Sequence, residues 1–160
     1  TPYATGYRQL LQTFNKLIEN DVNVTYLTNS LSSSPNYPAF SNYMLHRKEF
    51  IKTGIHIFEY QSDGSKSLHT KALLIDDTLS VVGSFNLDHR SLSLNTETIV
   101  YLKGKEANQA LQEIFNKRIK ESNEITSDAP FTVVPGNVPL KKRILMIISG
   151  FFSYILEPMI

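Results

Sequence analysis

Two short apolar runs, with three polar residues between them, limit the possible folds more than any other segment. Residues 68–75 and 79–82 are rich in leucine, isoleucine and valine, and residues 76–78 between them are Asp-Asp-Thr. Such a pattern predicts a β-hairpin. In a hairpin the end of the second strand returns to the start of the first, so side chains placed at those two ends lie side by side.

The rest of the chain alternates between helical and strand-like patterns. Apolar residues recur at helical spacing from Thr5, the expected N-cap, and a second helix is expected to stop at Gly54. The polar stretches 29–38 and 62–66 are expected loops. The predicted helices are 5–19, 41–52 and 106–122, and the further predicted strands are 22–27, 55–60 and 95–102. We therefore expect an α/β fold, a mixed β-sheet flanked by helices, over residues 1–125, with 126–160 as a C-terminal extension.

Four polar side chains fall at the ends of the predicted hairpin. His69 and Lys71 are two residues apart and share one face of a strand, as do Ser84 and Asn86. An imidazole beside an ammonium group suits an anion better than a core, because lysine supplies charge and histidine a nucleophilic or proton-carrying nitrogen. Serine and asparagine add hydrogen-bond donors, and Gly83 would let backbone or ligand approach closely. Together these residues predict a pocket for a phosphoryl group.

The composition of the chain excludes several kinds of chemistry for that pocket. The 160 residues carry a net charge of +1, whereas a protein that grips long nucleic acid usually has a large basic excess. The chain has no cysteine, which excludes disulfides, thiolate metal sites and a cysteine nucleophile. It has no P-loop sequence either, so nothing favours kinase chemistry. The sequence therefore favours a small phosphate pocket over a nucleic-acid groove.

The same segment resembles the HKD motif of the phospholipase D superfamily. Residues 83–91 (G-S-F-N-L-D-H-R-S) and 94–97 (L-N-T-E) are also similar to the second half of bacterial cardiolipin synthases and related phospholipase D-like proteins. The resemblance implies a phospholipase D-like half-domain. The full motif is H-x-K, four residues, D, six residues, G-S-x-N, and its positions are His69, Lys71, Asp76, Gly83, Ser84 and Asn86.

The resemblance implies a two-step phosphodiester transfer that needs no metal or other cofactor. One motif histidine forms a phosphohistidine, and a histidine from a second motif copy protonates the leaving alcohol and activates the incoming one. By this resemblance His69, Lys71 and Glu97 are catalytic, and Glu97 is hydrogen-bonded to the far ring nitrogen of His69. Phosphate binding is assigned to Lys71, Ser84 and Asn86. Structural support is assigned to Asp76, through hydrogen bonds at the turn, to Gly83, and to Asp88 and Arg90 as an ion pair.

The complete motif occurs once in this chain, whereas the superfamily site is built from two copies. The opening run Thr1-Pro2-Tyr3 resembles the residues that follow the first strand of the second half in cardiolipin synthases. We therefore expect a C-terminal half whose first strand is absent, and whose partner is the N-terminal HKD half of the same parent protein. His69 would then be the general acid and base, and the chain alone would be inactive. A homodimer of one-motif chains is the alternative.

The resemblance favours a phosphatidyltransferase of the cardiolipin synthase type, with phosphatidylglycerol as the phospholipid substrate. The parent protein would then act at the bacterial cell membrane, on its cytoplasmic face or peripherally, although this chain alone would be soluble. Two alternatives stay open: a phosphodiester hydrolase, either a phospholipase D or an endonuclease, and a non-catalytic binding half. Nucleic acid is the less favoured substrate, because the lysines and arginines are spread along the chain.

The C-terminal extension differs in composition from the rest. Lys141-Lys142-Arg143 precede an uncharged run, 144–156, which is shorter than the roughly 20 residues of a spanning helix. A basic cluster before an apolar helix suits a segment that lies on an anionic membrane surface. A helix packed on the core of the domain itself is the equal alternative.

Overall fold

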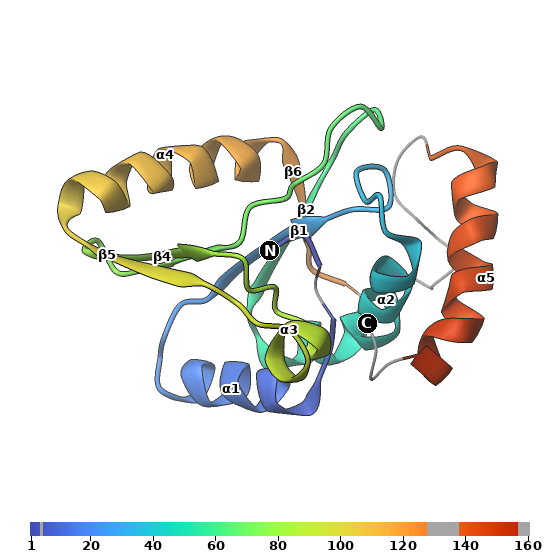
Figure 1. Ribbon diagram of the computed structural model, residues 1–160, viewed down its shortest axis with the longest axis horizontal. Helices are drawn as coiled ribbons and strands as arrows, with labels where there is room; N and C mark the ends of the chain where they lie inside the picture. Colours follow the sequence, from blue (N-terminus) through green and yellow to red (C-terminus); the bar gives the residue numbers. More distant parts are fainter. Residues whose placement is uncertain (4, 128–137, 157–160) are drawn as a thin grey trace.

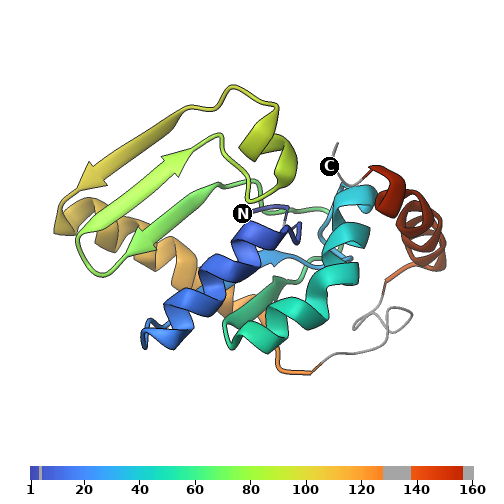
Figure 2. The same ribbon diagram turned by 90° about the horizontal axis from the view of Figure 1, so that it is seen from below.

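The computed structural model describes residues 1–3, 5–127 and 138–156, which form two three-stranded sheets and five helices (Figure 1). The sheet of β3, β4 and β5 lies at one end of the molecule and α5 at the other, with the sheet of β1, β2 and β6 between them (Figures 1 and 2). The helices are α1 (Arg8–Glu19), α2 (Tyr37–Thr53), α3 (His89–Ser93), α4 (Lys105–Lys120) and α5 (Leu140–Leu156). The strands are β1 (Thr25–Asn29), β2 (His56–Tyr60), β3 (Ala72–Ile75), β4 (Leu79–Gly83), β5 (Ile99–Lys103) and β6 (Ser122–Ile125).

The sheet of β1, β2 and β6 carries the hydrophobic core. β1 pairs in parallel with β2, and β2 pairs antiparallel with β6. The fully buried ring of Phe50 in α2 packs against Phe14 of α1, Tyr26 of β1 and Tyr43 of α2, with ring centroids 5.7–6.1 Å apart. Helix α2 ends where Gly54 takes the left-handed conformation (φ 88°), which costs glycine no Cβ clash. One aromatic cluster thus joins two helices to this sheet.

The predicted hairpin is present as β3 and β4, and β5 extends it into an antiparallel sheet. The turn falls at residues 76–78, as predicted, with Asp76 in the left-handed conformation (φ 52°). Helix α4 runs along this sheet (Figure 2). All five residues of β5 are exposed, so this sheet is covered much less completely than the first.

The α/β class and the mixed strand pairing are confirmed, but several predicted boundaries are wrong. The N-cap of α1 is Tyr7 rather than Thr5, which is buried. Helix α2 begins at Tyr37, within the predicted loop, because the Asn36 side chain caps it. Helix α4 ends at Lys120, and β6 follows at once; its sequence S-N-E-I holds one apolar residue, so no strand pattern marked it.

Helix α5 packs along α2 through one side only. Met146, at 1% exposure, faces the domain, and the Ser41 hydroxyl of α2 donates to the Met146 carbonyl oxygen at 2.8 Å. The alternative in which this helix packs on the core is therefore confirmed for its inner side, while its outer side is exposed. Residues 128–137 and 157–160 of the predicted extension lie outside the described residues.

Candidate active site

His69 and Lys71 lie side by side directly before β3. The sequence predicts both inside a strand, but β3 begins only at Ala72, so they occupy the extended segment that leads into it. The Lys71 ammonium group donates to His69 Nε2 at 3.2 Å and to the His69 carbonyl oxygen at 2.9 Å. The two side chains therefore converge as predicted, through a local hydrogen bond instead of a shared strand face.

The contact between Lys71 and His69 involves Nε2 of the imidazole ring. A charged Lys71 can only donate, so Nε2 is the acceptor in this contact. The His69 side chain is exposed, and Tyr3 meets its ring edge-on with centroids 6.5 Å apart. The site thus presents an exposed imidazole with an ammonium group beside it.

The electrostatic surroundings of Lys71 connect the two ends of the hairpin. Partial burial lowers the pKa of Lys71, because desolvation disfavours the ammonium ion. The carboxylates of Asp88 and Glu97 oppose that shift. Both carboxylates follow β4 in the chain, so the segment after β4 lies close to the segment before β3, as the hairpin predicts.

Gly83 allows two backbones to approach at the end of the hairpin. A Cβ atom at this position would lie 2.2 Å from the carbonyl oxygen of Thr98, which is a severe clash. The Gly83 N–H donates to the Lys71 carbonyl oxygen at 3.1 Å, and Gly83 pairs with Ile99 in the ladder between β4 and β5. The close approach that the sequence predicts here is made by the backbone of the chain itself.

Ser84 and Glu97 form a short hydrogen bond where β4 and β5 meet. The Ser84 hydroxyl donates to Glu97 Oε2 and accepts from the Thr98 N–H at 3.0 Å. The Asn95 amide donates to Glu97 Oε1 at 3.1 Å. These hydrogen bonds lower the pKa of Glu97, and the bond from Ser84 lowers it most. Among the described residues the Glu97 carboxylate accepts from Ser84 and Asn95 and makes no hydrogen bond to His69, so the pairing of Glu97 with His69 stays a prediction.

Asn86 is fixed through its main chain and carries a buried amide oxygen. Its backbone N–H donates to Ser91 Oγ at 3.2 Å, which fixes the main chain at this point. Its side-chain Oδ1 is buried and, among the residues the structure describes, has no hydrogen-bond partner. A buried acceptor left without a partner costs about 1–3 kcal/mol, and because Oδ1 only accepts, only a hydrogen-bond donor would satisfy it.

A short helix that sequence analysis missed, α3, positions this segment. The Asp88 carboxylate accepts from the Ser91 N–H at 2.6 Å and so caps the helix. Arg90 Nε donates to Asn95 Oδ1 at 3.3 Å, next to the amide that binds Glu97. The expected ion pair between Asp88 and Arg90 is therefore wrong, and the support that the two residues give to the motif stays a prediction. The aspartate cap was the signal in the sequence that could have revealed α3.

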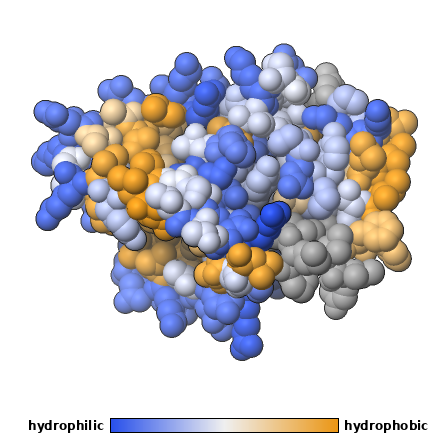
Figure 3. Space-filling view, in the orientation of Figure 1, coloured by the Kyte–Doolittle hydropathy of each residue, from blue (hydrophilic) through white to orange (hydrophobic). Residues whose placement is uncertain are grey.

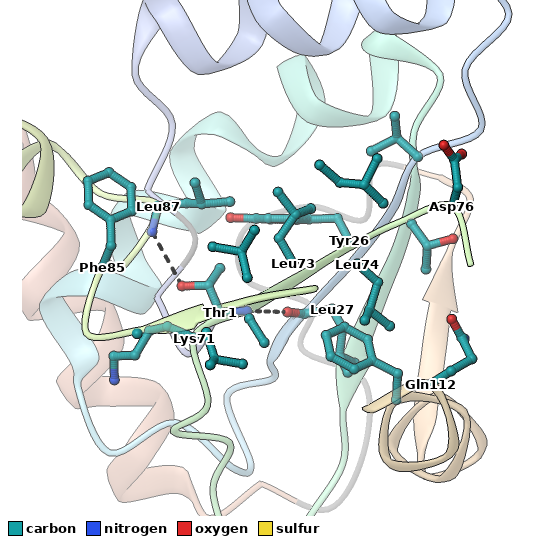
Figure 4. A pocket seen from close by; sticks show the side chains of 18 of the residues that line it. Thr1, Tyr26, Leu27, Lys71, Leu73, Leu74, Asp76, Phe85, Leu87 and Gln112 are labelled. Atoms are coloured by element: carbon teal, nitrogen blue, oxygen red, sulfur yellow. Dashed lines mark hydrogen bonds between the residues drawn. The ribbon is translucent and has the colours of Figure 1, made fainter. Parts of the chain in front are cut away.

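Asp76 lies away from the other motif residues. Lys71 and Asp76 stand at opposite ends of β3 (Figure 4). The Asp76 side chain is exposed and makes no hydrogen bond to any described residue, so the predicted role of hydrogen bonds from Asp76 is wrong. The neighbouring Asp77 carboxylate lies 3.7 Å from Lys105 Nζ, at the start of α4.

The tripeptide His46-Arg47-Lys48 also matches H-x-K but belongs to the core side of the molecule. It lies within α2, where Arg47 is buried with its Nε atom 3.1 Å from Glu59 Oε1. Thr53 stands where the motif requires aspartate. The tripeptide is thus part of a packed helix, and the complete motif remains single.

An apolar groove of about 720 Å³ borders Lys71 and separates β1 from β3 (Figure 4). In the part of the chain that is described, β1 and β3 are each the edge strand of a sheet, so both present backbone hydrogen-bonding groups there. At one end, the Thr1 amino group donates to the Leu27 carbonyl oxygen at 3.1 Å. A groove between two strand edges is what an absent strand would leave, but the absent first strand stays a prediction.

Fold and motif geometry together define a protein of the phospholipase D superfamily. More particularly, residues 1–119 match the family model described as "Cardiolipin synthase, PLD-like domain", and the chain belongs to that family.

Individual relatives agree with this assignment. The chain is 30% identical over 101 residues to cardiolipin synthase 1 of Staphylococcus epidermidis, covering 63% of this chain and 20% of the relative. Phosphatidylserine synthase of Haemophilus influenzae superposes with a TM-score of 0.71 at 16% identity, over 100% of this chain and 40% of that one. The phospholipase D family member Nuc of Salmonella typhimurium superposes with a TM-score of 0.64 at 16% identity, over 79% of each chain. The two structural likenesses, at 16% identity, show the fold alone. The matched part of the chain spans about a fifth of the length of cardiolipin synthase 1.

Proposed function

We propose that this chain supplies one half of the active site of a phosphatidyltransferase of the cardiolipin synthase type. The observation that carries the proposal is the exposed His69 imidazole with the Lys71 ammonium group 3.2 Å from its Nε2 atom. A cation beside a nitrogen that can move protons can hold a phosphodiester while the nitrogen assists its cleavage. The likeness to cardiolipin synthase 1 of S. epidermidis supports a phosphatidyl group as the transferred unit.

The proposed reaction consists of two displacements at phosphorus. In the first, a histidine from a second H-x-K copy attacks, and its N–P bond forms as the bond to the leaving alcohol oxygen breaks. His69, protonated at this stage, gives its proton to that oxygen. In the second, the acceptor hydroxyl loses its proton to His69 and attacks phosphorus, which frees the other histidine. With phosphatidylglycerol as donor and acceptor, the products are cardiolipin and glycerol.

Other residues of the site hold and orient the phosphate in this scheme. Lys71 turns from His69 to a non-bridging oxygen, and the Asn86 amide binds the same group, which stabilises charge in the transition state. Ser84 and Glu97 act as positioning residues, because their hydrogen bond keeps the segment before β5 against the end of β4.

The second H-x-K copy is part of the proposal because one imidazole cannot stay bonded to phosphorus and also transfer protons. We place that copy in another part of the parent polypeptide, with a homodimer of this chain as the alternative arrangement. The apolar side chains of β5 are exposed. This exposure supports the proposal that another part of the protein, or a second copy, packs against β5.

The reaction is tested by lipid mass spectrometry on a protein that holds both motif copies. The protein is incubated with phosphatidylglycerol in detergent micelles, which removes any need for a bilayer. Cardiolipin and glycerol in equal amounts are expected. Phosphatidic acid in place of cardiolipin would show that water is the acceptor and that the protein is a hydrolase. Cleavage of nucleic acid with no lipid product would make it an endonuclease.

A further inference from the structure

Helix α5 has two apolar sides that meet different surroundings. Its inner side packs on α2 through the buried Met146. Its outer side is apolar as well, and the residues on it recur at helical spacing, so they form one continuous face. The members of this outer face are Leu140, Ile144, Ile147, Ile148, Phe151 and Phe152, all exposed.

This outer face is the apolar patch at the right edge of Figure 3, over α5 in the orientation of Figure 1. Phe151 is 75% exposed and Leu140 is 71% exposed. Isolated apolar side chains on a surface are ordinary, but a contiguous patch of large ones marks a binding surface. The helix therefore presents a surface suited to an apolar partner.

The charge at one end of α5 identifies the kind of partner. Lys141, Lys142 and Arg143 occupy the first turn, and no acidic residue lies in the helix. Cations at a helix N-terminus add to the positive end of the helix dipole, so this end attracts an external anion. Lys142 donates to the Ser32 carbonyl oxygen at 2.9 Å, which holds the start of the helix on the domain.

We propose that α5 is an interfacial helix that binds the surface of an anionic bilayer, with its outer face in the zone between headgroups and acyl chains and the exposed Lys141 of its first turn against lipid phosphates. A continuous apolar face beside a cationic end complements such a surface in both respects. No helix in the described ranges is long and apolar enough to cross a bilayer. This inference is independent of the proposed function, because adsorption to lipid needs no catalysis.

Vesicle co-sedimentation of the full chain tests the apolar part of the proposal. Phosphatidylcholine vesicles containing phosphatidylglycerol should bind the chain, and Phe151→Ser should weaken that binding about tenfold or more, because a phenylalanine side chain no longer enters the interface. The matched control is Ile114→Ser, which removes an exposed apolar residue from α4. It should change binding less than about twofold.

A charge reversal tests the electrostatic part. Lys141→Glu should weaken binding to the anionic vesicles about tenfold and leave binding to pure phosphatidylcholine unchanged, because only the first carries surface charge. Lys117→Glu, an exposed lysine of α4, is the control for the change in net charge. Added salt should weaken binding of the unaltered chain to the anionic vesicles.

Three results would overturn the proposal. The first is a chain that binds neither kind of vesicle, and the second is an equal loss of binding in the α4 controls. The third is a loss in His69→Ala as large as in Phe151→Ser, which would place the lipid contact in the catalytic site. Circular dichroism of each variant shows whether it is folded, and size-exclusion chromatography with light scattering shows whether α5 instead joins two protein copies. The product assay in micelles remains a separate test of the reaction.

Discussion

The two sheets of this protein are built from similar short strands but differ in what covers them. In the sheet of β1, β2 and β6, Ile57 and the neighbouring Phe50 have no exposed surface. In the sheet of β3, β4 and β5, Tyr101 is 69% exposed, and every residue of β5 is exposed. The residues proposed to be catalytic lie at one end of the second sheet, before β3 and β5 and after β4. One sheet therefore carries the packed core, while the other, which is more exposed, borders the proposed site.

The largest effect that tests this comparison comes from the core. Phe50→Ala should lower the free energy of unfolding by about 3–5 kcal/mol, because it leaves a cavity among Phe14, Tyr26 and Tyr43. Tyr101→Ala, the matched aromatic truncation on β5, should cost no more than about 0.5 kcal/mol. Urea unfolding followed by circular dichroism measures both. Similar losses in the two variants would mean that the second sheet is packed as tightly as the first.

A second prediction concerns the connection between β4 and β5. Gly83→Ala should lower the free energy of unfolding by about 1–3 kcal/mol, since the added Cβ would clash with the Thr98 carbonyl oxygen. Hydrogen exchange should speed up at the Ser84 N–H, which donates to that carbonyl oxygen at 3.0 Å. Exchange in β1 and β2 should be unchanged, because the effect stays within the open sheet. Leu73→Ala, an exposed truncation on β3, is the control. If Ser84 keeps its protection in Gly83→Ala, the close approach does not determine this pairing.

Much of the fold was predictable because its signals are local. The hairpin follows from apolar runs around a polar turn, and the end of α2 follows from Gly54. The strand β6 was not predictable, since its one apolar residue, Ile125, joins a core whose other members, among them its strand partner Ile57, lie far away in the sequence.

In the site, too, the local features were predictable and the contacts between distant segments were not. The convergence of His69 and Lys71 follows from their spacing. The partner of Glu97 does not, because it depends on how the segment before β5 bonds to Ser84. Local sequence cannot specify that contact.

A third prediction tests the cap that positions the segment after β4. Asp88→Ala should lower the free energy of unfolding by about 1 kcal/mol, because the Ser91 N–H loses its side-chain acceptor. Asp88→Asn should lower the free energy of unfolding by less than Asp88→Ala does, since asparagine also caps helices well. Thermal unfolding of the two variants measures the difference. Equal losses would show that the charge of Asp88 matters more than its cap.

The smallest effect concerns the ionisation of Glu97. Its pKa lies below the ordinary glutamate value of 4.5, chiefly because of the hydrogen bond from Ser84. Since the folded pKa is lowered, the carboxylate contributes stability above pH 4.5, and this contribution is lost as the pH falls through the folded pKa. Ser84→Ala should raise the pKa of Glu97 toward its ordinary value in a carbon-13 NMR titration. Ser93→Ala, on the nearby α3, should leave it unchanged; a pKa unmoved by Ser84→Ala would contradict the assigned cause.

The most direct test of the central claim, that the His69 and Lys71 pair forms a catalytic half-site, compares two histidine variants in a protein with both motif copies. His69→Ala should lower the rate of cardiolipin formation about 10²- to 10⁴-fold by removing the group that transfers protons. His56→Ala should keep nearly full activity, because the side chain of this exposed histidine of β2 hydrogen-bonds to Glu124 of β6, away from the motif residues. Equal rates in the two variants, with both folded, would contradict the account.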